Sequence, residues 1–162
     1  MATAINGIVV QDQANSALAG SPTAPAGTSA LAVTRLGAYL TGSGSGSGEV
    51  FAYDKATKQI FVMNNVTDRV EIVSLADPSH MTKVSEINVG ALADYGGMNS
   101  VAIANGVLAV AVESSTATNA GQVALYSTST GALLKTVVVG VLPDMLTFTA
   151  DGKKIVVANE GE

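Results

Sequence analysis

The sequence predicts an all-β repeat protein made of β-propeller blades, each a four-stranded antiparallel sheet packed against the next. One observation is the hairpin signals, Asn105-Gly106 and Asp151-Gly152, which separate short β-rich runs. The other observation is that the pattern of β-rich runs repeats at a regular interval. The second run of each unit ends at Asn65, Glu113 and Glu160, which are 48 and 47 residues apart. Four strands that recur every ~40–50 residues are typical of propeller blades, and a β-sandwich would not restart at the same turn.

The repeat gives about two and a half blades. The first blade is expected at about 50–90, with strands at 51–54, 59–65, 69–75 and 82–90. The second blade is expected at about 98–140, with strands at 98–104, 107–113, 122–128 and 133–140. A half blade at 143–162 follows, with strands at 145–150 and 153–160. Because propellers close with roughly four to eight blades, we expect a fragment of a larger propeller, or a unit that closes a ring by self-association.

Residues before the first blade follow a different pattern. Residues 1–29 are mostly small and polar, and they predict an N-terminal arm or loop with one short strand at 8–10. Residues 30–162 form the expected partial propeller, and the strand at 30–40 is a candidate outer strand of another blade. The Gly/Ser run at 42–48 predicts a flexible loop, since glycine and serine offer no apolar anchor.

Composition excludes several classes of protein. The 162 residues carry a net charge of −5 without basic clusters, which argues against a nucleic-acid partner. There is no cysteine, so disulfides and thiolate metal sites are excluded. No apolar run approaches the ~18–20 residues of a transmembrane helix, so we expect no transmembrane segment.

A catalytic centre is not predicted. The single histidine, His80, stands with Asp77 in a segment whose Asp-Pro-Ser order is typical of a turn, where a histidine is usually solvated. The sequence contains no Gly-x-Ser-x-Gly nucleophile motif. We therefore name no catalytic residue and no cofactor-binding residue.

Calcium is the one cofactor that the side chains suggest. The oxygen-bearing residues form two groups: Asn64, Asn65 and Asp68, and then Asn159, Glu160 and Glu162. Oxygen ligands suit calcium. The EF-hand spacing is absent, however, and asparagine and aspartate at such places more often form turns with their own backbone. The metal site is thus left open between these two interpretations.

A polar rim is the main candidate site. Asn65, Glu113 and Glu160 occupy the same place in three successive units, and Asn159 precedes the last of them. Equivalent strand ends lie on one rim of a propeller, so these side chains are candidates for lining a pocket or the channel mouth. The alternative is that strand ends are simply polar.

Residues 31–162 resemble the bacterial choice-of-anchor I domain, within the broader set of YVTN-like propellers. The stretches that carry the resemblance are TRLGAYLTG (34–42), EVFAYDKATKQIFVMNN (49–65), GGMNSVAIANGVLAVAVE (96–113) and LPDMLTFTADGKKIVVANEGE (142–162). The resemblance implies an exported or surface-attached protein, and it covers the front part of such a domain. The Gly/Ser run departs from the bulkier, more acidic loop expected there. Some relatives are joined to alkaline phosphatase or phytase-like esterase functions.

Two functions follow from these observations. The first is an exported or cell-surface module with a structural or interaction role, whose partner is itself or the remainder of a full-length chain. The second is the propeller portion of a metal-dependent alkaline phosphatase or phytase-like esterase. Further sequence would discriminate them: a cluster of Asp, His and Glu ligands favours the enzyme, and another repeat with an anchor signal favours the module.

Overall fold

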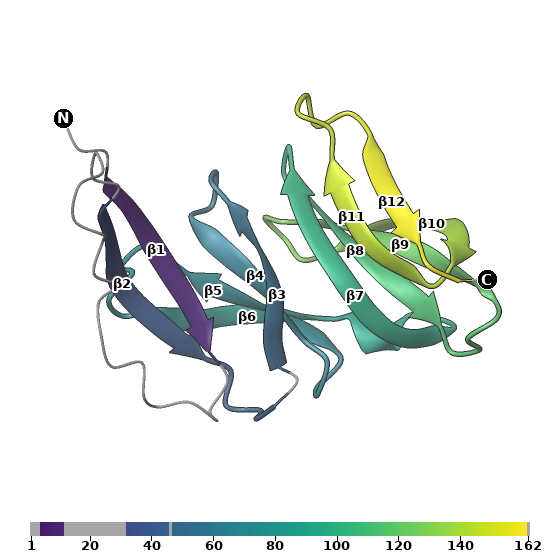
Figure 1. The fold of residues 1–162 in the computed structure, drawn as a ribbon, viewed down its shortest axis with the longest axis horizontal. Helices are drawn as coiled ribbons and strands as arrows, with labels where there is room; N and C mark the ends of the chain where they lie inside the picture. Colours follow the sequence, from purple (N-terminus) through teal and green to yellow (C-terminus); the bar gives the residue numbers. More distant parts are fainter. Residues whose placement is uncertain (1–3, 12–31, 46, 162) are drawn as a thin grey trace, which may run out of the picture.

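The structure, a computed structural model, describes residues 4–11, 32–45 and 47–161. Figure 1 shows an all-β architecture in which sheets follow one another along the molecule. The strands are β1 (Ala4–Gln11), β2 (Ala32–Leu40), β3 (Ser47–Asp54), β4 (Gln59–Asn64), β5 (Arg69–Ser74), β6 (Thr82–Asn88), β7 (Tyr95–Ala104), β8 (Val107–Ser114), β9 (Ala120–Ser127), β10 (Leu133–Val141), β11 (Pro143–Phe148) and β12 (Ile155–Asn159). A 3-10 turn, η1 (Val89–Ala91), joins β6 to β7.

The two predicted four-stranded sheets are confirmed. Strands β3 to β6 form one antiparallel sheet in chain order, and β7 to β10 form the next. Strands β11 and β12 form an antiparallel pair, the predicted half blade. We call these sheets blade 1, blade 2 and the half blade. The prediction of an all-β chain of propeller blades is therefore correct.

The blades pack face to face through apolar side chains. The inner strands β3, β7 and β11 lie side by side, as Figure 1 shows. Blades 1 and 2 share one buried cluster, which contains Phe61, Met63, Val70, Ile72, Ile87, Met98, Val101, Leu108, Val110, Val112, Ala124 and Tyr126. Blade 2 and the half blade share another, which contains Ala109, Ala111, Val123 and Leu146. Successive residues of a strand point to opposite faces, so each blade is apolar on both faces.

The strand register establishes which residues are equivalent. Phe51 pairs with Val62, Val101 pairs with Val110, and Leu146 pairs with Val157. In each pair the residue on the inner strand, which is Phe51, Val101 or Leu146, lies on the face of the sheet that points toward the preceding unit. Phe51 is 43% exposed, whereas Leu146 is 1% exposed against blade 2. The same repeat position is thus buried only where a blade precedes it.

The first hairpin is formed as predicted, and the second is longer. Asn105 and Gly106 both have positive φ, 52° and 77°, as a tight type I′ turn requires. The strands of the half blade end at Phe148 and resume at Ile155, so the turn at Asp151-Gly152 sits inside a six-residue connection. Asp151 caps this loop by accepting a hydrogen bond from the Lys153 amide at 3.1 Å.

The N-terminal elements differ from the expectation in two ways. The predicted strand at 8–10 is part of a longer strand, β1, which pairs in parallel with β2 rather than in an antiparallel blade. Strand β3 begins at Ser47, so the predicted Gly/Ser loop is wrong at its last two residues, Ser47 and Gly48. Ser47 is buried, and its hydroxyl lies 2.6 Å from the Thr41 hydroxyl and donates to the Gly44 carbonyl at 2.7 Å. Of the expected arm at 1–29, residues 1–3 and 12–29 lie outside the described residues.

Candidate interaction surfaces and polar sites

The predicted rim residues serve the junctions between blades. Asn65 follows β4 and donates its side-chain amide to the Met98 carbonyl of β7 at 3.0 Å. Glu113, on β8, accepts a hydrogen bond from Asn99 at 3.3 Å, and Asn99 also donates to the Pro143 carbonyl of β11 at 3.0 Å. The Asn65–Met98 and Asn99–Pro143 contacts each tie one blade to the inner strand of the next, whereas the Asn99–Glu113 contact lies within blade 2. The structure therefore places Asn65 and Glu113 at equivalent but separate junctions.

The last two rim candidates lie at the end of β12. Asn159 packs against Gly140, where an added Cβ would fall 2.7 Å from the Asn159 Cγ. The Glu160 amide donates to the Leu142 carbonyl at 2.8 Å. A hollow of about 150 Å³ lies beside Glu113, and its other lining residues are Gly96, Ser114, Ser115, Ala117 and Leu142. Glu113 is the one predicted rim residue that lines this hollow, and a shared ligand site for all of them stays a prediction.

The histidine cluster does not have the geometry of a hydrolase triad. His80 Nδ1 lies 3.0 Å from Asp77 Oδ2 and 2.9 Å from the Ser79 hydroxyl. A triad needs the carboxylate and the hydroxyl on opposite ring nitrogens, so that a proton can pass through the ring. Here one nitrogen meets both groups, and the cluster is exposed. Hydrogen bonds from Ser79 and then from His80 lower the pKa of Asp77 to about 2.

The first group of calcium candidates is engaged within the chain. Asn64 Oδ1 accepts the amides of Val66 and Thr67 at 3.2 and 3.3 Å, which is an Asx turn. Asp68 Oδ1 accepts the hydroxyl of Tyr95 at 2.9 Å. Within residues 4–11, 32–45 and 47–161, no three His, Asp or Glu side chains converge as a metal site would require. Of the second group, Glu162 lies outside the described residues.

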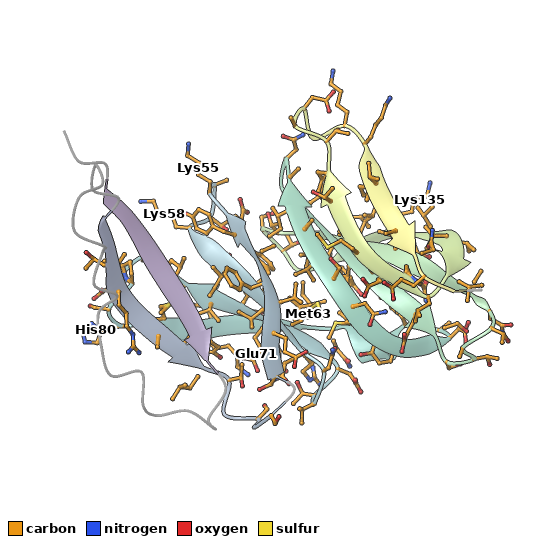
Figure 2. All side chains as sticks on the ribbon, viewed as in Figure 1. Lys55, Lys58, Met63, Glu71, His80 and Lys135 are labelled. Carbon is orange, nitrogen blue, oxygen red and sulfur yellow. The ribbon has the colours of Figure 1, made fainter. Side chains whose placement is uncertain are left out.

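A buried polar network, missed by the sequence analysis, lies between β2 and blade 1. Glu71 is buried on β5. The flanking residues Val70 and Ile72 already indicate a core strand in the sequence, but a buried carboxylate was not expected between them. Its two carboxylate oxygens accept hydrogen bonds from the Tyr39 hydroxyl at 2.6 Å and from the Asn64 amide at 2.9 Å. Burial and then the hydrogen bond to Glu71 raise the pKa of Tyr39 well above its usual value. Figure 2 labels Glu71 near the lower end of blade 1. Because a buried charge needs partners, this network anchors β2 to blade 1.

The outer strand of blade 2 exposes an apolar surface. We call it the β10 face, a name for the exposed large side chains on both sides of this edge strand, which are Leu133, Leu134, Val137 and Val138. Val138 is 76% exposed, the highest fraction among the exposed large apolar residues of the described chain. Contiguous exposed apolar side chains mark interaction sites more often than scattered ones do. No sequence expectation singled out this strand as a site.

A groove lies between the β10 side of blade 2 and the half blade. Its volume is about 410 Å³, and it is lined by Ala104, Asn105, Val107, Val123, Leu125, Val137, Val139, Phe148, Gly152, Lys153, Ile155 and Val157. Most of these side chains are apolar, and the groove continues the buried cluster between blade 2 and the half blade. We call it the β12 groove.

Comparisons with known proteins agree with this architecture. A family model described as the choice-of-anchor I domain matches residues 49–162. Among solved structures, the chain is similar to the hydrazine synthase of Kuenenia stuttgartiensis, with a TM-score of 0.56 and 18% identity over 70% of this chain and 30% of that chain. It is also similar to a luciferin-regenerating enzyme, with a TM-score of 0.44 and 18% identity over 62% of this chain and 32% of that chain.

These structural likenesses concern the fold alone, because the identities are low. The chain spans about a third of the length of either structure. A search of curated proteins found no match. In the part of the chain that the structure describes, no helix has the length and hydropathy needed to cross a membrane.

Proposed function

Because the chain belongs to the choice-of-anchor I domain family, we propose that it is a structural module that assembles with a second copy of itself through β10. Membership of this family indicates a surface or extracellular protein. The observation that supports the assembly is the β10 face, an exposed apolar strand at the edge of a sheet.

Comparison with blade 1 shows why β10 is unusual. Strand β6 is the equivalent outer strand, and it carries Lys83 and Glu86 at the free edge of its sheet. Charged side chains protect an edge strand from pairing with another chain. Strand β10 is two residues longer and carries only Lys135. The outer edge of blade 2 is therefore far less protected than that of blade 1.

The sequence of β10 suits antiparallel pairing with its own copy. In a two-fold pairing centred on Val137, Lys135 of one chain lies opposite Val139 of the other, so the two lysines do not face each other. Each strand offers its free backbone groups to the other, and the exposed leucine and valine side chains leave water together. Burial of apolar surface contributes about 0.8 kcal/mol for each CH₂ removed from water.

Sedimentation velocity of the 162-residue chain over a concentration series tests this assembly. We expect a reversible dimer, and we expect Val138→Lys to raise its dissociation constant at least about tenfold. Val138 is largely exposed in the single chain, so the substitution is compatible with folding.

The matched control is Val84→Lys on β6, an exposed valine on the other outer strand. This variant is expected to dimerise as the unaltered chain does. A chain that stays monomeric throughout the series, or a Val138→Lys variant that dimerises normally, contradicts the proposal.

A further inference from the structure

Charged side chains are divided between the two ends of the blades. The turns that join β3 to β4, β7 to β8 and β11 to β12 lie at one end, and we call these three turns the hairpin rim. The hairpin rim carries four exposed lysines, Lys55, Lys58, Lys153 and Lys154. Lys58, Gly106 and Lys153 are 48 and 47 residues apart, which is the period of the repeat. The rim therefore presents lysines at equivalent positions of blade 1 and the half blade.

These lysines have no carboxylate partner in the part of the chain that the structure describes. The ion pairs found there include none of the four. Asp54 and Asp151 lie in the same turns, but each accepts a hydrogen bond from an amide of its own turn, that of Ala56 at 2.9 Å and that of Lys153 at 3.1 Å. Since four lysines stand with two aspartates, the hairpin rim has an excess of positive charge.

The opposite end of the blades carries carboxylates. We call them the acidic rim, and its members are Asp68, Asp94, Glu113, Asp144 and Glu160. Hydrogen bonds from Ser115 and then from Ser114 lower the pKa of Asp94, so this carboxylate is ionised at neutral pH. Arg69 begins β5 at the same end, but it is already paired with Glu86 at 3.0 Å. The acidic rim therefore has an excess of negative charge.

Neither rim is a place where blades pack. The two blades and the half blade contact each other through the faces of their sheets, and the turns at the strand ends lie outside those faces. Figure 2 labels Lys55 and Lys58 at the upper end of blade 1 and Glu71 toward its lower end. Any further blade would pack on a sheet face in the same way, so it would leave both rims open to a partner.

We propose that the hairpin rim of one chain binds the acidic rim of a second copy, so that copies stack end to end. The contact joins two unlike surfaces, so it goes beyond the proposed β10 dimer, in which like strands pair. Charge complementarity favours a second copy as the partner, because the same chain carries both surfaces and opposite charges attract and orient them.

The repeat also gives the two rims a common spacing. The strand ends on the acidic side recur at the same 48 and 47 residues as the turns of the hairpin rim. We therefore expect each unit to stand over the same unit of the next copy. Lys58 then lies over the unit that carries Asp68, and Lys153 lies over the unit that carries Asp144 and Glu160.

Sedimentation velocity of the 162-residue chain carrying Val138→Lys tests the stacking without the proposed β10 contact. At about 0.1 M salt, where the Debye length is about 10 Å, the sedimentation coefficient is expected to rise with protein concentration. At about 1 M salt, where that length is about 3 Å, the rise is expected to disappear. The β10 contact is apolar and persists in salt, so the two proposals fail independently.

Two charge reversals in this background assign the contact to the two rims. One variant combines Lys58→Glu with Lys153→Glu, and the other combines Asp144→Lys with Glu160→Lys. All four side chains are exposed, so the substitutions are compatible with folding. Each variant alone is expected to stack at least about tenfold more weakly, because like charges then face each other. An equal mixture of the two is expected to stack again, since opposite charges meet at every contact.

Lys135→Glu is the matched control, because Lys135 is an exposed lysine of β10 that belongs to neither rim. It is expected to stack as its parent does. The proposal is overturned if sedimentation does not respond to salt, if the reversed variants stack as well as their parent, or if their mixture does not restore stacking. Retention of a non-stacking chain on immobilised heparin, lost in Lys58→Glu with Lys153→Glu, also overturns it, because the lysines then serve an anionic polymer.

Discussion

The hydroxyl of Tyr39 donates a 2.6 Å hydrogen bond to Oε2 of Glu71, and this contact ties β2 to the buried face of blade 1. Tyr39 packs there in a cluster with Ile60, Val62 and Val73. The contact joins residues 32 positions apart in the chain, so it helps to hold the N-terminal strand in place.

Replacement of Tyr39 by phenylalanine is expected to lower the free energy of unfolding by about 1–3 kcal/mol, because a buried carboxylate loses a donor. Urea unfolding measures the change. Tyr53→Phe is the control, since the Tyr53 side chain is half exposed, and it is expected to change stability by less than about 0.5 kcal/mol. Equal stability of the two variants would show that the Glu71 contact contributes nothing.

Stability is expected to fall in alkaline solution. Burial, followed by hydrogen bonds to Glu71 and Asp68, raises the pKa values of Tyr39 and Tyr95 above the usual 10.0. Above that pH the unfolded chain loses tyrosine protons that the folded chain retains, so unfolding becomes easier as the pH rises. Denaturation midpoints measured from about pH 8 to about pH 11 test this. In Tyr39→Phe the decline above pH 10 is expected to be shallower, and an unchanged decline would contradict the assignment.

The junction between blade 2 and the half blade is expected to depend on Leu146. This side chain is 1% exposed, so Leu146→Ala leaves a cavity and should cost about 2–5 kcal/mol. The neighbouring Met145 is 57% exposed, and Met145→Ala should cost less than about 0.5 kcal/mol. Thermal or urea unfolding compares the two variants, and similar losses would argue against the blade-to-blade packing described above.

Removal of one hydroxyl is expected to stabilise the protein. Tyr126 Oη is buried, and among the described side chains it is the one buried polar atom without a hydrogen-bond partner. Burial also raises the pKa of Tyr126 to about 12. Since an unsatisfied hydroxyl costs about 1–3 kcal/mol, Tyr126→Phe should keep or raise the free energy of unfolding. The change in the free energy of unfolding is thus expected to differ in sign from that of Tyr39→Phe. A clear loss of stability in Tyr126→Phe would reveal a hydrogen-bond partner for this hydroxyl.

The Asp77 carboxyl, in an exposed turn, is expected to have a pKa below the usual value for aspartate. Its hydrogen bonds from Ser79 and His80 hold the pKa of Asp77 at about 2. Ser79→Ala removes the leading cause, so the pKa of Asp77 should rise toward the usual 3.8. Carbon-detected NMR titration of the carboxyl measures this directly. An unshifted carboxyl in the unaltered chain would show that the turn does not hold these contacts in solution.

Much of the fold could be predicted because its determinants are local. The Asn105-Gly106 turn requires positive φ at both residues, and this pair adopts that conformation at low cost, so the hairpin was visible in the sequence. The spacing of Asn65 and Glu113 likewise located equivalent strand ends, because each blade repeats the same local pattern. The N-terminal pairing was not visible, since parallel pairing of β1 with β2 depends on where a distant segment docks.

The sites were harder to predict because they depend on what lies across from each residue. Glu71 has the sequence context of a strand residue, but only the packing of β2 against blade 1 gives its carboxylate two donors. Val137 and Ile87 are both apolar residues of outer strands, and the sequence alone does not distinguish them. By itself, the sequence determined the all-β class, the repeat period and the order of strands, because backbone preferences and alternation act over a few residues. Only the tertiary structure decided that Ile87 is covered by a following blade while Val137 faces an open groove, because burial is a relation between segments far apart in the chain.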